Sequence, residues 1–229
     1  MTEARERLHA QCEASGLAVT RSGLEATSPI GLLADYLVAM LEENQRVNLT
    51  AIRNAERASL LHAADSLALG DLPGASGPAL DLGTGNGFPG VALAAIQEGL
   101  DVALCDRTRR KIRAIERALD AASWPGTRRG RVSPEWLDAE QAPATKPDWV
   151  HRFGRITARA VATPEVCLAL AKPLLGKDGD VVLWLSEETA SQHTPPKSAG
   201  WRSEDHRYTL RHADGREERT AVLRRYLRS

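Results

Sequence analysis

The chain has 229 residues, of which 42% are hydrophobic and 26% are charged, and its formal net charge is zero. The length fits one domain with a substantial core, and the composition excludes a disordered chain. A net charge of zero excludes a general attraction to nucleic acids. Basic residues nevertheless cluster in 106–119 and 127–132. Charge alone leaves open whether they form a polyanion-binding patch or a solvated helix face.

No apolar run approaches the roughly 20 residues that span a bilayer. The N-terminal stretch carries both signs of charge and lacks the apolar core of a signal peptide. We therefore expect a cytoplasmic protein without membrane contact. The cysteines Cys12, Cys105 and Cys167 are far apart in the sequence and have no neighbouring histidine cluster. This spacing predicts buried free thiols and no metal site.

The first 78 residues predict helices. One helix is expected over residues 3–15. The Ser28-Pro29 pair predicts the start of a second helix that ends near Asn44, and Asn54 predicts the start of a third. The second helix is amphipathic, because apolar residues recur at helical spacing, at Leu32, Leu33, Tyr36, Leu37, Met40 and Leu41.

After residue 78 the pattern changes to short apolar strands that alternate with helices. Strands are expected at 79–82, 101–106, 129–132, 154–161 and 180–186, and helices at 89–98, 108–122 and 164–175. This alternation predicts an α/β fold with a mostly parallel, doubly wound sheet. Two strand-like runs around Asp214-Gly215 predict a C-terminal antiparallel hairpin. We expect one domain, in which a helical segment, 1–78, packs on a core, 79–229.

The first predicted strand leads into a glycine-rich loop, "ALDLGTGNGFPGVALAAI" at 79–96. Gly83 and Gly85 remove side chains where a ligand can approach the backbone at the carboxyl edge of the sheet. A nucleoside triphosphate loop is excluded, because no lysine follows Gly90. A dinucleotide fingerprint is present in Gly85, Gly87 and Gly90, followed by Asp106.

Asp81, two residues before the first glycine, opposes a pyrophosphate by charge repulsion. S-adenosylmethionine has a sulfonium and an ammonium group instead of phosphates, so Asp81 can accept from it directly or through water. Asp106 can accept both ribose hydroxyls, or cap the helix that follows. These residues favour an S-adenosylmethionine-dependent methyltransferase over a nicotinamide-dependent oxidoreductase.

Four segments occur in a characteristic order: "NLTAI" (48–52), "HAADSLAL" (62–69), "LDLGTGNGFPG" (80–90) and "ITARAVA" (156–162). With them the chain resembles the RsmG family, also called GidB. Members are class I, Rossmann-like methyltransferases that use S-adenosylmethionine to methylate N7 of a guanine in 16S ribosomal RNA. The resemblance covers roughly Asn48 to Ser186.

The resemblance implies that Gly83 and Phe88 line the cofactor pocket, and that Val132 and Ser133 contact the adenine through their backbone. It also places Arg159 beside the methyl donor and the substrate. A buried arginine at a strand end needs a partner. An ion pair between Arg159 and Asp81 or Asp65 is therefore the structural alternative to a functional role.

Two positions depart from the family pattern. Ser133 stands where members usually carry Glu, and Leu185-Ser186 stands where they usually carry Lys-Gly. The second departure removes a positive charge from the expected RNA side. It leaves open a related methyltransferase with a changed substrate, or a non-catalytic protein that binds the cofactor and acts in assembly or regulation.

Guanine N7 has a lone pair and no proton to lose, so no catalytic base is expected. His62 and Asp65, one helical turn apart, are expected to cover the cofactor or to pack the helices on the sheet. RNA phosphates are expected to meet basic residues after the second strand, namely Arg107, Arg109, Arg110, Lys111 and Arg113. The expected partner is ribosomal RNA within the small subunit or its precursor, bound by a monomer. Four other histidines, His151, His193, His206 and His212, are expected at the surface or in loops.

Overall fold

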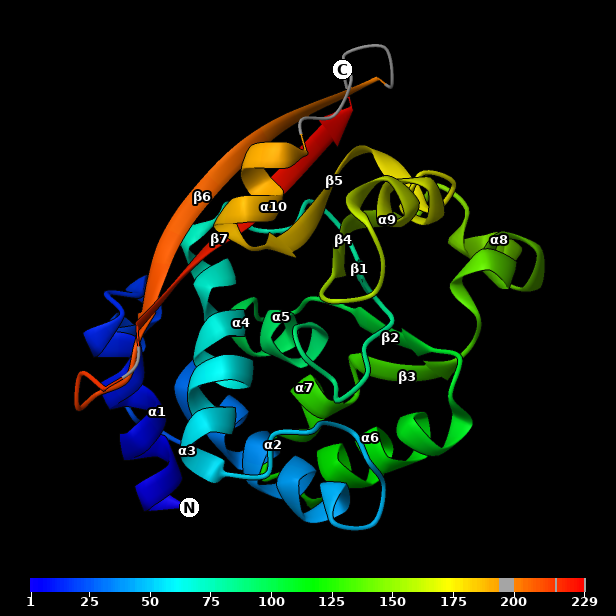
Figure 1. The fold of residues 1–229 in the computed structure, drawn as a ribbon. Helices are drawn as coiled ribbons and strands as arrows, with labels where there is room; N and C mark the ends of the chain where they lie inside the picture. Colours follow the sequence, from blue (N-terminus) through cyan, green and yellow to red (C-terminus); the bar gives the residue numbers. More distant parts are fainter. Residues whose placement is uncertain (194–199, 217, 229) are drawn as a thin grey trace.

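A seven-stranded sheet forms the centre of the molecule (Figure 1). The computed structural model describes residues 1–193, 200–216 and 218–228. The strands are β1 (Ala79–Leu82), β2 (Val102–Asp106), β3 (Val132–Trp136), β4 (Phe153–Ala158), β5 (Leu175–Leu185), β6 (Trp201–Arg211) and β7 (Glu218–Arg228). Their order is β3-β2-β1-β4-β5-β7-β6. The first five are parallel, while β7 runs antiparallel to both β5 and β6. The predicted fold class and its C-terminal hairpin are confirmed.

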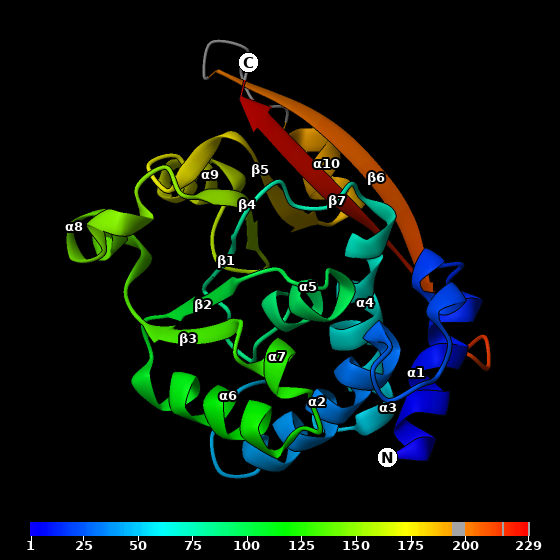
Figure 2. The same cartoon turned by 180° about the vertical axis from the view of Figure 1, so that it is seen from behind.

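Helices cover both faces of this sheet (Figures 1 and 2). They are α5 (Gly90–Ile96), α6 (Arg109–Ala121), α7 (Gly126–Arg129), α8 (Ala142–Thr145), α9 (Pro164–Ala171) and α10 (Glu187–Gln192). Successive strand residues point to opposite faces. Leu104 packs in the cluster that contains Ile115 of α6, whereas Cys105 packs in the cluster that contains Leu168 of α9. The sheet is therefore the middle layer of three.

Two of the N-terminal helices, α2 and α3, begin where their caps predict. They are α1 (Thr2–Ala14), α2 (Pro29–Asn44), α3 (Ala55–Ala58), a π-helical turn (Ser59–Ala64) and α4 (Asp65–Leu67). The Ser28 hydroxyl accepts from the Gly31 N–H at 3.0 Å. The side-chain oxygen of Asn54, Oδ1, accepts from the Arg57 N–H at 2.9 Å. Each of these side chains satisfies one free donor of a helix start.

The helical segment shares its core with the sheet. Leu8 and Met40 belong to the same apolar cluster as Leu104. The indole N–H of Trp124 donates to the Leu32 carbonyl at 2.7 Å. At the other end, the tip of the β6–β7 hairpin reaches α1 (Figure 1), where the Arg211 N–H donates to Ser15 Oγ at 2.8 Å. The prediction that one domain consists of a helical segment, 1–78, and a core, 79–229, stays a prediction.

Several element bounds differ from those expected. The third strand is 132–136 rather than 129–132, because β3 is an edge strand and an edge tolerates Pro134. Helix α9 ends at Ala171, since a residue before proline, here Lys172 before Pro173, disfavours helix. β5 begins at Leu175, where it pairs with Phe153 of β4 before a register shift.

Two further expectations concern cysteines and membranes. Cys12, Cys105 and Cys167 are free and buried, as predicted. Within the part of the chain that the structure describes, no helix combines the length and hydropathy needed to cross a bilayer.

Candidate cofactor and substrate site

The glycine loop joins β1 to α5 where the strand order reverses between β1 and β4. Ligands of open α/β sheets bind outside the carboxyl ends of the strands at such a point. Gly83, Gly85 and Gly87 have φ values of +63°, +60° and +89°, in the left-handed region that favours glycine.

These glycines have different roles. A Cβ at Gly87 would lie 2.1 Å from the Tyr36 hydroxyl, and one at Gly90 would lie 2.2 Å from Leu104 Cδ2. Both positions are therefore glycine because of packing. At Gly85 the nearest atom to an added Cβ is the Gly83 carbonyl oxygen, at 3.7 Å. Gly85 thus leaves its backbone bare toward open space.

That open space is a cavity of about 460 Å³. Its lining includes Gly83, Gly85 and Phe88 of the loop, His62, Asp65 and Arg159, and Leu185 and Ser186 at the end of β5. A second cavity, of about 340 Å³, shares Gly83, Asp106 and Lys111 with the first and extends to Leu137 and Asp138. The two cavities form one elongated site along the carboxyl ends of β2, β1 and β4.

Asp106, the last residue of β2, lies between the two cavities. Its Oδ2 accepts from the Gly85 N–H at 3.1 Å, and its Oδ1 accepts from the Thr108 N–H at 2.7 Å. Thr108, not Asp106, is the residue that precedes α6. Each carboxylate oxygen keeps a second acceptor position. Asp106 can therefore hold a diol while it ties the glycine loop to β2.

Asp81 holds the loop from within. Its side chain is fully buried and is not among the residues that line either cavity. Its carboxylate accepts from the Gly90 N–H at 3.0 Å and from the Thr157 hydroxyl at 2.7 Å. Burial raises the pKa of Asp81 to about 6, although these hydrogen bonds favour the charged form. In this arrangement Asp81 shapes the cofactor loop.

Phe88 connects the loop to the N-terminal helices. Its ring stacks on the His62 ring, with centroids 5.9 Å apart, and meets Tyr36 edge-on at 5.5 Å. The Tyr36 hydroxyl donates to the Asn86 carbonyl at 2.9 Å. The loop is therefore held from α2 as well as from β1 and β2.

Arg159, directly after β4, is largely buried in the wall of the larger cavity. Its guanidinium donates to Asp65 Oδ2 at 2.8 Å and to the Leu61 carbonyl at 3.2 Å. The ion pair with Asp65 is thus present. It does not remove Arg159 from the site, because Arg159, Asp65 and His62 all line the cavity.

Asp65 is itself fixed by the C-terminal half of the chain. The Tyr208 hydroxyl of β6 donates to Asp65 Oδ1 at 2.5 Å, and the Trp184 indole N–H of β5 donates to the Asp65 carbonyl at 3.2 Å. Burial, together with the Asp65 carboxylate, raises the pKa of Tyr208 above its ordinary value, so its hydroxyl stays a donor. Tyr208, Asp65 and Arg159 form a chain that ends at the cavity.

His62 is a poor acid–base group. Burial, with the Arg159 cation nearby, lowers the pKa of His62 to about 3. Its Nε2 lies 2.9 Å from the Thr50 hydroxyl. The imidazole is neutral near pH 7 and too weakly basic to serve as an efficient general base.

The strand bounds change the position expected for Val132 and Ser133. Val132 pairs with Val102, the first residue of β2, so both residues lie at the start of β3 and away from its carboxyl end. Ser133 lines a separate depression with Asp101. The expectation that these two residues follow the third strand is wrong, because the strand continues past Pro134. Leu137 and Asp138 occupy the position after the strand and line the smaller cavity.

The first turn of α6 carries Arg109, Arg110 and Lys111 and no acidic residue. Cations at a helix N-terminus oppose the helix dipole and are locally unfavourable. Among the described residues these three side chains form no ion pair, whereas Arg117 on the same helix pairs with Glu43 at 2.5 Å. Lys111 lines both cavities, and Arg109 and Arg110 are exposed beside them. The arrangement leaves three cations available to an anion at the rim of the site.

Sequence reasoning missed several residues of the site. No local motif marks four residues that line the cavities, Leu137, Asp138, Trp184 and Arg219, because only the folded sheet brings them there. Tyr208 does not line either cavity and is linked to the site through its hydrogen bond to Asp65. Among the histidines, His212 lies in the loop of the β6–β7 hairpin, as expected, but it is buried there between Glu56 and Asp214. The side chains of Glu56, His212 and Asp214 approach one another closely enough to share a cation. Arg216 also pairs with Asp214 and lies 4.0 Å from Glu56 Oε1, so it offsets part of their negative charge.

Comparisons with known proteins agree with this geometry. The family model described as "GidB: rRNA small subunit methyltransferase G" matches residues 30–204. The ribosomal RNA small subunit methyltransferase G of Chromobacterium violaceum is 33% identical over 162 residues, which are 69% of this chain and 72% of that protein. The protein of the same name from Symbiobacterium thermophilum is 31% identical over 199 residues, with 82% and 78% covered. A third, from Deinococcus deserti, is 32% identical; the match spans 70% of this chain and 64% of that protein.

Solved structures share the fold at low sequence identity. A predicted O-methyltransferase from Agrobacterium tumefaciens superposes with a TM-score of 0.52 at 19% identity, over 70% of this chain and 79% of that one. P. horikoshii TYW2, solved in complex with MeSAdo, superposes with a TM-score of 0.52 at 13% identity, over 73% and 63%. These likenesses establish a class I methyltransferase fold. With the family match over residues 30–204, this chain belongs to the GidB family, rRNA small subunit methyltransferase G.

Proposed function

We propose that the protein transfers a methyl group from S-adenosylmethionine to N7 of a guanine in the 16S RNA of the small ribosomal subunit. One observation carries this proposal. The elongated site is lined by the bare glycine loop, by the Asp106 carboxylate, which both cavities share, and by Arg159. Membership of a family named for small-subunit rRNA methylation supports the same reaction.

The residues of the site fit this cofactor. A Cβ at residue 85 would occupy the open space beside the loop backbone. The glycine leaves this space to a ligand that lies against the backbone. Asp106 would take the ribose hydroxyls, and Leu137 would border the adenine in the smaller cavity. Gly83, Gly85 and Phe88 would surround the methionine end, with Asp81 as the buried support of the loop. S-adenosylmethionine supplies an electrophilic methyl group when it is bound.

The protein's own task is to position the guanine. Guanine N7 presents a lone pair and no proton, so its methylation releases none and needs no base. Arg159, held by Asp65, would orient the guanine or an adjoining phosphate. The neutral His62 would pack beside it without removing a proton. Holding N7 in line with the methyl group and excluding water can accelerate the transfer without a base, because positioning alone lowers the barrier of enzymatic reactions substantially.

The partner follows from the charged rim. Arg109, Arg110 and Lys111 would contact RNA phosphates, which supply affinity without sequence choice. The proposal places the protein in the cytoplasm, as a monomer without a metal ion, on the small subunit or its precursor.

A changed RNA substrate is the second candidate, because Leu185 and Ser186 line the larger cavity without a positive charge. A protein that binds the cofactor but no longer catalyses is less well supported. Such a protein would have no need of the Tyr208–Asp65–Arg159 chain. A nicotinamide cofactor would place a pyrophosphate beside the loop that Asp81 supports, and a titration with both cofactors separates the two.

The test uses methyl-labelled S-adenosylmethionine and small subunits from cells that lack their own enzyme of this type, with naked 16S RNA in parallel. An Arg159→Ala variant removes the central cation. Arg152→Ala serves as the matched control, because it removes an exposed arginine whose one ion pair among the described residues is with Asp148. We expect label in subunits with wild type and Arg152→Ala, and at least a tenfold loss with Arg159→Ala. Cofactor binding without any label in either RNA would contradict the proposed activity and favour the second candidate or the non-catalytic one.

A further inference from the structure

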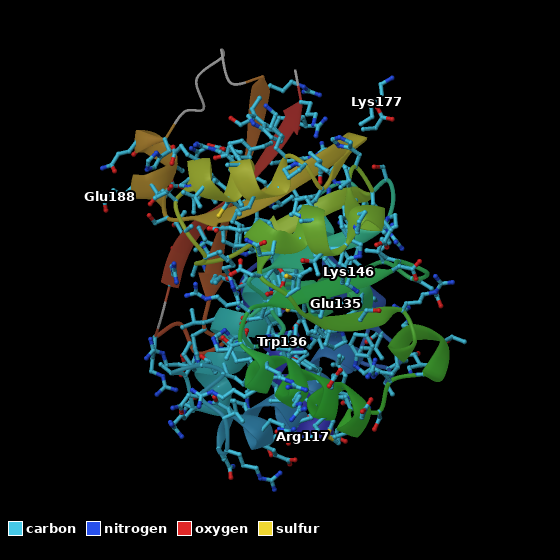
Figure 3. All side chains as sticks on the ribbon, turned by 90° about the vertical axis from the view of Figure 1, so that its right-hand side faces the viewer. Arg117, Glu135, Trp136, Lys146, Lys177 and Glu188 are labelled. Atoms are coloured by element: carbon cyan, nitrogen blue, oxygen red, sulfur yellow. The ribbon has the colours of Figure 1, made fainter. Side chains whose placement is uncertain are left out.

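Trp136 is the most exposed large hydrophobic side chain of the described residues, with 58% of its surface accessible. Three of the other tryptophans, Trp124, Trp149 and Trp201, are buried. Figure 3 shows Trp136 between Glu135 of the same strand and Arg117 of α6, on the right-hand side of the view in Figure 1. An indole of this size in water costs free energy unless something covers it.

The exposed ring is held in place. Its Nε1–H donates to the Arg107 carbonyl at 3.1 Å. The Arg109 guanidinium carbon lies 4.9 Å from the ring centroid, which is a cation–π distance. One contact with Arg107, just before α6, and one with Arg109 of α6 therefore fix the indole before any partner binds. Little side-chain entropy is then left to lose on binding.

The cofactor is not the occupant of this surface. Trp136 belongs to the edge strand β3 and is not among the residues that line the two cavities of the site. The two residues that contact its ring, Arg107 and Arg109, are both arginines. Arg107, Arg109 and Arg110 are exposed and, in the part of the chain that the structure describes, have no carboxylate partner. An aromatic face beside unpaired arginines matches an unpaired nucleotide, which offers a flat base and a phosphate.

We propose that Trp136 is a stacking platform for an unpaired base of the RNA substrate, with Arg109 and Arg110 on the adjoining phosphates. The proposal rests on the proposed function, since it takes ribosomal RNA as the partner. It adds a contact outside the methyl-transfer site. Because every base has a flat face, this contact supplies affinity and orientation rather than choice of base.

The decisive experiment measures binding without turnover. Small subunits and naked 16S RNA are titrated separately with wild type, Trp136→Ala and Trp136→Phe in the presence of demethylated cofactor. Val150→Ala, which shortens an exposed apolar side chain away from the site, is the control. We expect Trp136→Ala to weaken binding by roughly 5- to 100-fold for both RNAs. Trp136→Phe should retain most of the affinity, and the control should retain all of it.

Two further readouts separate stacking from charge. Trp136→Ala should leave the slope of affinity against salt unchanged, whereas Arg109→Ala should reduce that slope by about one. Binding of RNA should also change the fluorescence of Trp136, and this change should be absent in Trp136→Phe. Affinity of Trp136→Ala within twofold of wild type overturns the proposal. A loss with intact subunits but not with naked RNA also overturns it, and assigns the surface to a ribosomal protein. If Trp136→Ala weakens RNA binding as expected but wild type transfers no methyl group, the proposed activity is wrong and the proposed stacking contact is supported.

Discussion

The bare backbone at Gly85 gives the sharpest test of where the cofactor lies. An alanine there must adopt φ near +60°, which costs an L-residue about 1–2 kcal/mol and is partly offset by lower entropy of the unfolded chain. Its Cβ meets no atom of the protein closer than 3.7 Å, so no steric term is added. We expect Gly85→Ala to lower the free energy of unfolding by about 1 kcal/mol, or Tm by about 2–4 °C.

The effect on the cofactor should be larger. A ligand that packs against the Gly85 backbone must make room for the added methyl group, and overpacking of this kind costs about 1–3 kcal/mol. The affinity for S-adenosylmethionine should therefore fall roughly 5- to 150-fold. Isothermal titration calorimetry gives the affinity and thermal unfolding gives Tm.

Gly16→Ala is the matched control. Gly16 has φ of +67° with no atom within 4 Å of an added Cβ, and it does not line either cavity of the site. The two variants should lose similar stability, while Gly16→Ala keeps the affinity of wild type. If Gly85→Ala binds S-adenosylmethionine within twofold of Gly16→Ala, the cofactor does not lie against this loop and the assignment of the site is wrong.

Three further predictions concern buried polar contacts, two of them beside the site. Tyr208→Phe removes the donor that holds Asp65, so we expect a loss of about 1–3 kcal/mol in unfolding free energy. It should also reduce kcat more than it changes KM for the cofactor; a kinetically normal variant would show that Tyr208 does not position the site. The pKa of Asp81 is raised to about 6 from 3.8, so its contribution to stability is fully present below about pH 4 and is lost as the pH rises to about 6. Wild type should therefore lose about 2–2.5 kcal/mol relative to Asp81→Asn between pH 4 and 7 in urea titrations; parallel pH curves would contradict this. In the wild type, the buried Arg155 guanidinium donates to the Asp180 carboxylate at 2.8 Å. Asp180→Ala leaves this guanidinium without its main partner. It should cost about 3–5 kcal/mol by chemical denaturation, and a loss below 1 kcal/mol would show that the pair is not essential.

Local patterns in the sequence predicted the parts of the fold that depend on neighbouring residues. Ser28 and Asn54 began their helices because each cap acts within three residues of itself. The glycine loop was recognisable because its four glycines lie within eight consecutive residues. Asp106 was found for a similar reason, since it ends the next strand.

The remaining parts depend on contacts that no local pattern encodes. The hydrogen bond between Tyr208 and Asp65 joins residues 143 positions apart, so it exists only once β6 lies beside the helices. The end of β3 was misplaced because Pro134 reads as a strand terminator until the strand is known to be at an edge. His212 is buried because the hairpin tip folds against α3, which a reading of its own segment cannot anticipate.

The identity of the modified nucleoside tests the central claim most directly. Small subunits treated with the protein and S-adenosylmethionine are digested to nucleosides, and the methylated product is identified by mass spectrometry with an authentic standard. The account predicts one additional 7-methylguanosine per 16S RNA and none with Arg159→Ala. A methyl group on another atom or another base, or no added methyl group with an enzyme that binds the cofactor, would contradict it.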